Sequence, residues 1–274
     1  MEITLALGGG GIRGVAHLGV LRALEREGFR IQAVTGTSAG GIAAAVYAAG
    51  WTPEEMIDRF QDVNQGSLYS FGGGTAVLGN KGVRKMLNVF LGQETFADLK
   101  IPCALSAVDV EELRTVTLTE GRVVDAVLAT IAIPSVFPPQ DRGEACLVDG
   151  GVLEVIPVQA ARSLATDLPV VAVSLSPPPE RWKDLKTMDQ VVNPPLLRSL
   201  SKTSVGRAFE ISVRSVEIMN HWLAVSRLEL DQPDAVIWPE VGPIGLLETV
   251  EVAETAALGD QAVVEALPAL RELG

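Results

Sequence analysis

Short apolar segments alternate with segments of helical periodicity from the N-terminus onward, and this alternation constrains the fold more than any other feature. Residues 3–7 (ITLAL) and 31–36 (IQAVTG) are short apolar runs, and a helical pattern follows each of them. Strands that alternate with helices in this way favour a layered α/β domain with a mainly parallel sheet. We therefore expect an α/β fold in which functional residues lie where strands end and helices begin.

Glycine, proline and polar residues indicate where the first elements end. Apolar residues recur at helical spacing after Gly14, and Gly28 is placed to end that helix. Thr52 and Pro53, followed by two glutamates, predict a capped helix start. Residues 64–82 are rich in glycine and serine, which is typical of a loop or flap.

Further elements follow in the same alternating order, and no linker clearly divides the chain. We predict strands at 101–110, 114–121, 144–151, 168–176 and 235–239, and helices at 83–91, 123–140, 155–164, 196–230 and 248–273. Proline interrupts two of these helical patterns, and we expect breaks at Pro134 and Pro268. Residues 177–195 are polar and rich in proline, which predicts a surface excursion.

Charge and cysteine content exclude several classes of protein. The 274 residues include 22 lysines and arginines against 34 aspartates and glutamates, a formal charge of −12. Nucleic acids need a concentrated basic surface, so we expect no nucleic-acid partner. The charge balance also gives no polybasic patch that would hold the protein on anionic lipid. Cys103 and Cys146 lie in apolar contexts, which indicates reduced core residues. No segment resembles a signal peptide or a membrane span, so we expect a cytoplasmic protein.

The first glycine cluster, GGGGIRG at residues 8–14, lies between a predicted strand and a predicted helix. Gly9, Gly11 and Gly14 have the G-x-G-x-x-G spacing of a dinucleotide site. Such a site also needs a carboxylate at the end of the second strand, where this chain reads AVTGTS. The dinucleotide interpretation is disfavoured by that absence. Bare backbone amides at a helix N-terminus can instead stabilise another anion, including the oxyanion of an acyl-transfer intermediate.

The second motif is GTSAG, residues 36–40, which matches the G-x-S-x-G pattern of a nucleophile elbow. The predicted strand before it and helix after it are the context that such an elbow needs. Ser38 is then a candidate nucleophile, and the alternative is a serine that caps a helix in a small-residue turn.

A serine nucleophile needs a base, and the chain offers three candidates. His221 falls in the middle of a long predicted helix, and His17 has the apolar neighbours of a packed helix position. Asp149 in CLVDGG follows an apolar strand, which places its carboxylate where open α/β sheets carry their sites. An aspartate can act as general base without an imidazole. The alternative for Asp149 is an Asx turn with Gly150.

Together GGGGIRG, GTSAG and DGG, in this order and spacing, resemble the patatin-like phospholipases. Further matching stretches are ATIAIPSVFPP (129–139), IPCALSAVDV (101–110) and PEVGPIGLLE (239–248). The resemblance covers nearly all of residues 3–176, is weak between 177 and 235, and returns at about 236–270. It implies a three-layer α/β/α fold over a single domain, residues 1–274, with a variable and largely helical insertion at about 177–235.

The resemblance also implies an activity and its residues. It implies lipid acyl hydrolysis of the phospholipase or esterase type by a Ser–Asp dyad, with neither metal nor cofactor. Ser38 is then the nucleophile and Asp149 its base, and the backbone amides around Gly9, Gly10 and Gly11 form the oxyanion hole, with Arg13 at the motif's basic position. The glycines expected to support these motifs are Gly14, Gly36, Gly40, Gly150 and Gly151. DGG departs from the frequent form of the motif, which has alanine third.

Two functions remain open on this basis. The first is a serine acyl hydrolase that cleaves carboxylic esters, with a lipid or other acyl ester as substrate and transient contact with a membrane surface. The second is a lipid- or acyl-binding regulatory protein on the same fold, with weak or no catalysis. An intact serine and aspartate favour the first, because a protein that only binds lipid has no need of both.

Overall fold

The computed structural model describes residues 1–68, 70–71, 76–184 and 203–274. Its centre is an eight-stranded sheet, in the order β10-β9-β1-β2-β5-β8-β7 with β6 also paired to β5. The parallel strands are β1 (Glu2–Leu7), β2 (Arg30–Thr37), β5 (Cys103–Asp109), β9 (Val170–Val173) and β10 (Ala235–Ile237). Antiparallel pairing adds β6 (Arg114–Leu118), β7 (Gln140–Arg142) and β8 (Ala145–Asp149). A separate hairpin pairs β3 (Ser70–Phe71) with β4 (Leu78–Gly79).

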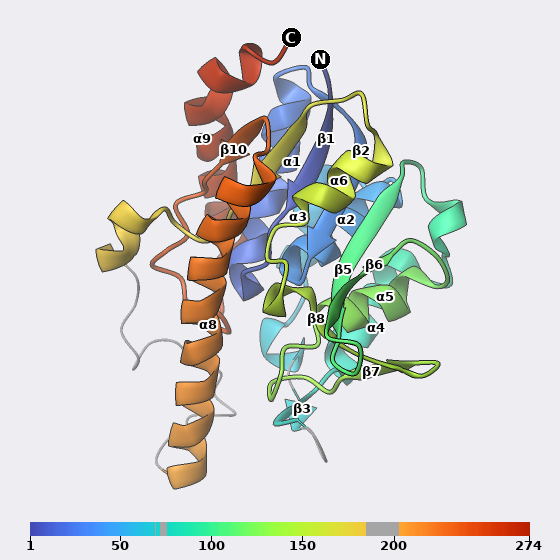
Figure 1. The fold of residues 1–274 in the computed structure, drawn as a ribbon, viewed down its shortest axis with the longest axis vertical. Helices are drawn as coiled ribbons and strands as arrows, with labels where there is room; N and C mark the ends of the chain where they lie inside the picture. The colour runs from blue at the N-terminus through green and yellow to red at the C-terminus, as the bar shows by residue number, and fades with distance from the viewer. Residues whose placement is uncertain (69, 72–75, 185–202) are drawn as a thin grey trace.

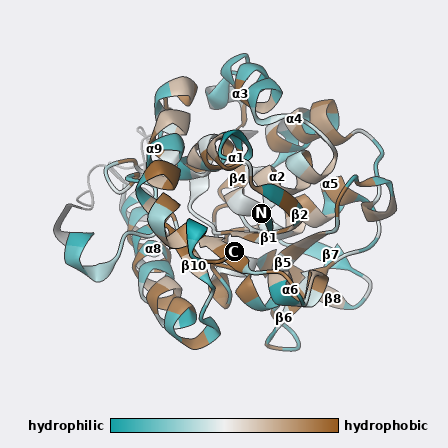
Figure 2. Cartoon of the chain, turned by 90° about the horizontal axis from the view of Figure 1, so that it is seen from above, coloured by the Kyte–Doolittle hydropathy of each residue, from teal (hydrophilic) through white to brown (hydrophobic). Residues whose placement is uncertain are grey.

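Helices cover both faces of the sheet, which makes the three layers (Figures 1 and 2). One face carries α1 (Ala16–Arg26), α2 (Ala39–Ala48), α3 (Pro53–Gln61), α4 (Lys81–Leu91), α5 (Val123–Thr130) and α9 (Val252–Arg271). The other face carries α6 (Val158–Leu164) and the long α8 (Ser204–Asp231). Short 3₁₀ helices are η1 (Gly11–Val15), η2 (Gln65–Leu68), η3 (Phe96–Asp98), η4 (Gly150–Val152) and η5 (Pro179–Asp184). The three-layer α/β/α fold with a mainly parallel sheet is thus confirmed.

Strand β1 shows why the sheet needs a layer on each face. Leu5 and Leu7 belong to the core beneath α1 and α2, whereas Ala6 belongs to a second core beneath α6 and α8. All three side chains are fully buried. A strand covered on both faces reads as an apolar run without alternation, which is the pattern of residues 3–7.

Most local signals act as the sequence predicts. Thr52 and Glu55 form a capping box at the start of α3, and Gly28 follows α1 with φ of +83°. The predicted break at Pro268 is wrong, because α9 continues through it to Arg271. Pro268 lies in the last turn, where its missing N–H removes a single hydrogen bond from a helix that packs against α1.

Two predictions fall partly outside the described residues. In the loop or flap at 64–82, residues 69 and 72–75 are not described, and the rest contains η2 and the β3–β4 hairpin. The predicted surface excursion and long helix overlap residues 185–202, which are not described either, and α8 begins at Ser204. Among the helices that the structure describes, none combines the length and apolar character needed to span a membrane.

Candidate active site

Ser38 lies on a strained turn between β2 and α2. Its backbone has φ of 53° and ψ of −122°, a conformation that residues other than glycine rarely adopt. The flanking glycines make the turn sterically feasible: a Cβ at Gly36 would lie 2.3 Å from the Gly40 carbonyl oxygen, and one at Gly40 would lie 2.2 Å from that of Leu7. The Ser38 side chain makes no capping hydrogen bond to α2, and a strained turn between a strand and a helix is the geometry expected of a nucleophile elbow.

Thr130 holds the elbow in place from α5. The Ser38 amide donates to Thr130 Oγ1 at 2.9 Å, and Thr130 Oγ1 donates to the Ser106 carbonyl oxygen at 2.5 Å. A strained backbone persists only where its surroundings hold it, and this pair of bonds does so. Sequence reasoning did not single out Thr130 as a site residue, although it lies in the matching stretch ATIAIPSVFPP.

Replacing Thr130 with valine should therefore lower the activity of the site without removing Ser38 or Asp149. Valine keeps the shape but leaves the Ser38 amide without its acceptor, at a cost of about 1–3 kcal/mol in stability. For the ester hydrolysis expected from the sequence, kcat should fall by about tenfold, because a displaced Ser38 would react more slowly. Thr130→Ser keeps the hydroxyl and is the control, and equal kcat in both variants would contradict this role.

Asp149 ends strand β8 beside Ser38 and is almost completely buried. Its Oδ1 accepts a hydrogen bond from the Gly151 amide at 2.7 Å. Its Oδ2 is buried and has no well-formed hydrogen bond to a described residue. Burial raises the pKa of Asp149 to about 7, although contact with the Ser38 hydroxyl and the Gly151 amide lowers it. The carboxylate can thus accept a proton near neutral pH, and Oδ2 is the oxygen available to take one.

The two glycines of DGG border the site closely. A Cβ at Gly150 would lie 2.4 Å from the Ser106 carbonyl oxygen, so this position excludes any side chain. A Cβ at Gly151 would lie 3.0 Å from Asp149 Oδ1, which means that the third residue of the motif touches the carboxylate. The Asx turn considered from the sequence is present as the bond from Gly151 to Asp149, and it coexists with the contact to Ser38.

The glycine loop, residues 8–14, lies against Ser38 and Ala39. A Cβ at Gly9 would lie 3.2 Å from the Ser38 Cβ, and one at Gly14 would lie 2.5 Å from the Ala39 Cβ. The Gly9 amide donates to the Val155 carbonyl oxygen at 2.9 Å. Within the described part of the chain, the amides of Gly10 and Gly11 have no protein acceptor. These two amides are therefore the donors left for an anion.

Arg13 does not present a free charge to the site. Its side chain is 3% exposed, donates from Nε to the Ile244 carbonyl oxygen at 2.6 Å and forms an ion pair with Glu217 of α8. The guanidinium is therefore part of the structure that holds the glycine loop.

Neither histidine is placed as a base for Ser38. His17 Nε2 lies 2.8 Å from the Gly8 carbonyl oxygen, and burial lowers its pKa to about 4, so the ring is neutral and donates to the loop. His221 is buried in α8 against Trp182, and burial together with Arg13 lowers its pKa to about 4. Both rings are neutral at physiological pH.

Ser106 and Glu154 form a polar support beneath the site that sequence reasoning missed. Ser106 Oγ donates to Glu154 Oε2 at 2.8 Å. The Glu154 main chain accepts from Thr37 Oγ1 at 2.8 Å and donates to the Gly150 carbonyl oxygen at 2.7 Å. Glu154 therefore links the strand before Ser38 to the loop after Asp149. No local pattern in the sequence marks it.

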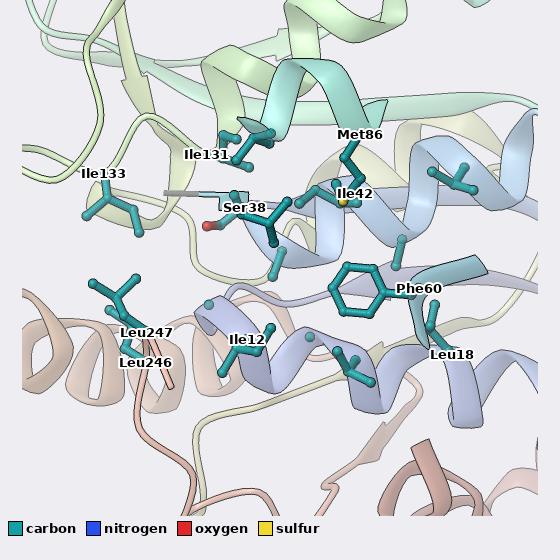
Figure 3. A pocket seen from close by; sticks show the side chains of 18 of the residues that line it. Ile12, Leu18, Ser38, Ile42, Phe60, Met86, Ile131, Ile133, Leu246 and Leu247 are labelled. Atoms are coloured by element: carbon teal, nitrogen blue, oxygen red, sulfur yellow. The ribbon is translucent and has the colours of Figure 1, made fainter. Parts of the chain in front are cut away.

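An apolar pocket leads away from Ser38 between the helices of one face (Figure 3). It encloses about 940 Å³, including a mouth that is open to solvent. Ile131 and Ile133 lie near Ser38, whereas Phe60 and Leu18 lie toward the other end. Its walls come from α1, α2, α3 and α4 and from residues 246–247. Apart from Ser38 its lining consists of apolar side chains and glycines, which suits a hydrocarbon chain.

Comparison with solved structures shows the same fold elsewhere. VipD from Legionella pneumophila superposes with a TM-score of 0.55 at 12% sequence identity, covering 99% of this chain and 67% of that one. At this level of identity the likeness concerns the fold alone.

Comparison of sequences identifies relatives. An uncharacterized NTE family protein of Mycobacterium tuberculosis is 29% identical over 287 residues, covering 99% of this chain and 47% of that protein. Lysophospholipase NTE1 of Mycosarcoma maydis is 34% identical over 174 residues, covering 58% of this chain and 9% of that protein. The chain thus spans about half the length of the mycobacterial relative. The family model described as patatin-like phospholipase matches residues 5–162, which carry the elbow, the glycine loop and DGG. The chain therefore belongs to the patatin-like phospholipase family.

Proposed function

We propose that this chain hydrolyses carboxylic esters of lipid acyl chains, with Ser38 as nucleophile and Asp149 as general base. The observation that carries the proposal is the strained serine beside a buried carboxylate at an apolar pocket. The strain and the burial both lower the stability of the fold, since strain costs on the order of 1–3 kcal/mol and a buried carboxyl loses hydration. Acyl transfer uses all three together.

In the proposed reaction, Ser38 Oγ attacks the ester carbonyl carbon while its proton passes to Asp149 Oδ2. The carbonyl electron pair moves onto oxygen, where the Gly10 and Gly11 amides stabilise the charge. Collapse of this intermediate expels the alcohol, which takes the proton from Asp149, and leaves Ser38 acylated. Water then attacks the acyl-enzyme and gives a proton to Asp149, and Asp149 returns this proton to Ser38 Oγ as the bond to the acyl group breaks and the fatty acid leaves. Each oxyanion donor typically contributes about 3–4 kcal/mol to such a reaction.

The apolar pocket supports an acyl chain, rather than a small acetyl group, as the part of the substrate that is recognised. Burial of each CH₂ group contributes about 0.8 kcal/mol, so a pocket of this kind rewards chain length until it is full. The lysophospholipase among the relatives is consistent with a lipid substrate. Hydrolysis of p-nitrophenyl esters from C4 to C16 and of lysophosphatidylcholine, with Ser38→Ala as blank, tests the proposal.

Two substitutions at the far end of the pocket should shift chain-length preference in opposite directions. Leu18→Trp fills this end, and we expect kcat/KM for C16 esters to fall by about tenfold while that for C4 esters stays within about twofold. Phe60→Ala enlarges it, and the optimum should move to longer chains. Val89→Trp, on an exposed position of α4, is the control for added bulk. A uniform loss on all chain lengths would contradict an acyl pocket.

The alternative is a lipid-binding regulatory protein with weak or no catalysis, which the apolar pocket would also suit. It leaves the strained backbone of Ser38 and the raised pKa of Asp149 unexplained. Tight fatty-acid binding without turnover of any ester in the panel would favour it. We further propose a cytoplasmic protein in which residues 1–274 form one domain, with the segment at 177–235 as a largely helical insertion.

A further inference from the structure

Glu217 of α8 reaches the glycine loop from a part of the chain that lies outside the matched residues 5–162. We propose that Glu217 is a positioning residue for the oxyanion hole, acting through Arg13. The inference rests on the proposed function, because it concerns the same Gly10 and Gly11 amides. The orientation of the glycine loop would then depend on α8, the long helix of the neighbouring layer (Figure 1).

The contact between the two elements is a buried ion pair. Arg13 Nη2 lies 2.5 Å from Glu217 Oε1, and both side chains are only 3% exposed. Removing one partner of such a pair leaves an uncompensated charge in the interior, which the structure avoids by moving the remaining group toward water. Because Arg13 belongs to η1, which begins at Gly11, we expect such a movement to displace the glycine loop.

A second ion pair fixes the Glu217 carboxylate in place. Its second oxygen, Oε2, lies 2.7 Å from Arg214 Nη1, one turn earlier on α8. Burial raises the pKa of Glu217, but Arg13 and Arg214 outweigh burial and keep it below its ordinary value. His221 Nε2 is 4.0 Å away on a neutral ring, so it does not compete for the carboxylate. The carboxylate stays charged and fixed in one orientation.

The loop carries its free amides between two anchored points. On one side the Gly9 amide is bonded to Val155, and on the other the Ile12 amide donates to the Leu246 carbonyl oxygen at 3.0 Å. Arg13 follows directly and adds its bonds to Ile244 and Glu217. Gly10 and Gly11 have no side chains to fix them, so their direction is set by these anchors. Loss of Glu217 would remove one of the two bonds that hold the Arg13 side chain, two residues from Gly11.

The expected effect is selective for the tetrahedral state. Oxyanion donors act on charge that exists only after Ser38 has attacked, so a misdirected loop lowers kcat and leaves ground-state binding unchanged. For Glu217→Gln we expect kcat to fall by about 10- to 100-fold with little change in KM. A merely structural role would lower the melting temperature without this split between kcat and KM.

An alkyl trifluoromethyl ketone tests the selectivity directly. Ser38 Oγ forms a bond to its carbonyl carbon, the carbonyl electron pair becomes an oxyanion, and the serine proton goes to Asp149. The adduct has no leaving group and therefore stays at the tetrahedral state. Its inhibition constant should rise in Glu217→Gln by the same factor as kcat/KM falls, while the affinity for a C12 fatty acid stays within about twofold of wild type.

Three variants and a control separate positioning from stability. Glu217→Gln removes the charge, and Glu217→Leu with Arg13→Met replaces the whole pair by apolar side chains that can restore stability. The control is Glu229→Gln on an exposed position of α8, which should behave as wild type. Glu217→Asp keeps the charge and should recover part of the lost kcat.

Each possible outcome either supports or overturns the inference. Folded Glu217 variants with reduced kcat and weakened ketone inhibition support the inference, and a low kcat in the stable apolar double variant supports it most strongly. Wild-type kcat and ketone affinity in folded Glu217→Gln, or in the folded double variant, would overturn it. Failure of all three Glu217 variants to fold would also overturn it, since the pair would then be structural. Absence of ester hydrolysis and of ketone binding in the wild type would instead refute the proposed function itself.

Discussion

Replacing Ser38 with alanine is expected to lower kcat for ester hydrolysis by at least about 10³-fold, because no other group can form the acyl-enzyme. The alanine occupies the same strained turn, and the amide bond to Thr130 remains, so the melting temperature should hardly change. Steady-state hydrolysis of a p-nitrophenyl ester and thermal denaturation measure the two effects.

The control for this substitution is Ser163→Ala, which removes an exposed hydroxyl on α6 and should keep full activity. Retention of more than about a tenth of wild-type kcat by a folded Ser38→Ala variant would contradict a serine nucleophile, since residual rates from binding alone are far smaller.

Replacing Asp149 with asparagine should have a comparable effect on catalysis and a second, opposite effect on stability. Asparagine cannot accept the Ser38 proton, so kcat should fall by at least about 10³-fold. In the wild type only the ionised carboxylate can act as base, and kcat/KM should rise with pH through an apparent pKa of about 7. The pH–rate profile of the wild type and the residual kcat of the variant measure this.

The stability effect follows from the direction of the pKa shift. Burial raises the pKa of Asp149 to about 7 from its ordinary value of 3.8, so its protonated form stabilises the fold fully below about pH 4. This contribution is lost as pH rises through about 7. Asparagine is neutral throughout and can keep the bond from Gly151. We expect Asp149→Asn to exceed the wild type in unfolding free energy by about 2–4 kcal/mol at pH 8, and by little at pH 4.

Urea denaturation at the two pH values measures this difference. Asp167→Asn, at an exposed position, is the control and should show no such pH-dependent gain. An Asp149→Asn variant that is less stable than wild type at pH 8 would mean that the carboxylate is not destabilised by burial. A pH–rate profile flat between pH 5 and pH 9 would contradict its role as base.

Much of the site could be predicted from the sequence because its signals are local. The elbow needs glycines at fixed offsets from Ser38, since the backbone approaches there leave no room for a Cβ. Asp149 is likewise marked by an apolar strand before it and glycines after it. Strands and caps are local too, which is why a layered α/β domain with a mainly parallel sheet and the start of α3 were predictable.

The remainder depends on contacts between residues far apart in the chain. Arg13 pairs with a residue 204 positions later, and the Ser38 amide bonds to one 92 positions later. Neither partner lies in a motif that reveals the contact. For the same reason, the sequence did not show that the Arg13 side chain pairs with α8. The rule that proline breaks a helix was applied to Pro268 without its surroundings, and it predicted a break that α9 does not have. Such features require the fold before they can be recognised.

Covalent labelling with a fluorophosphonate tests most directly whether Ser38 and Asp149 act as a dyad. Mass spectrometry of the wild type should find one adduct, on the peptide that contains Ser38, and its rate of formation should follow the ionisation of Asp149 near pH 7. Labelling should disappear in Ser38→Ala and slow by about 100-fold or more in Asp149→Asn. An adduct on any other residue, or an unchanged labelling rate in Asp149→Asn, would contradict the dyad.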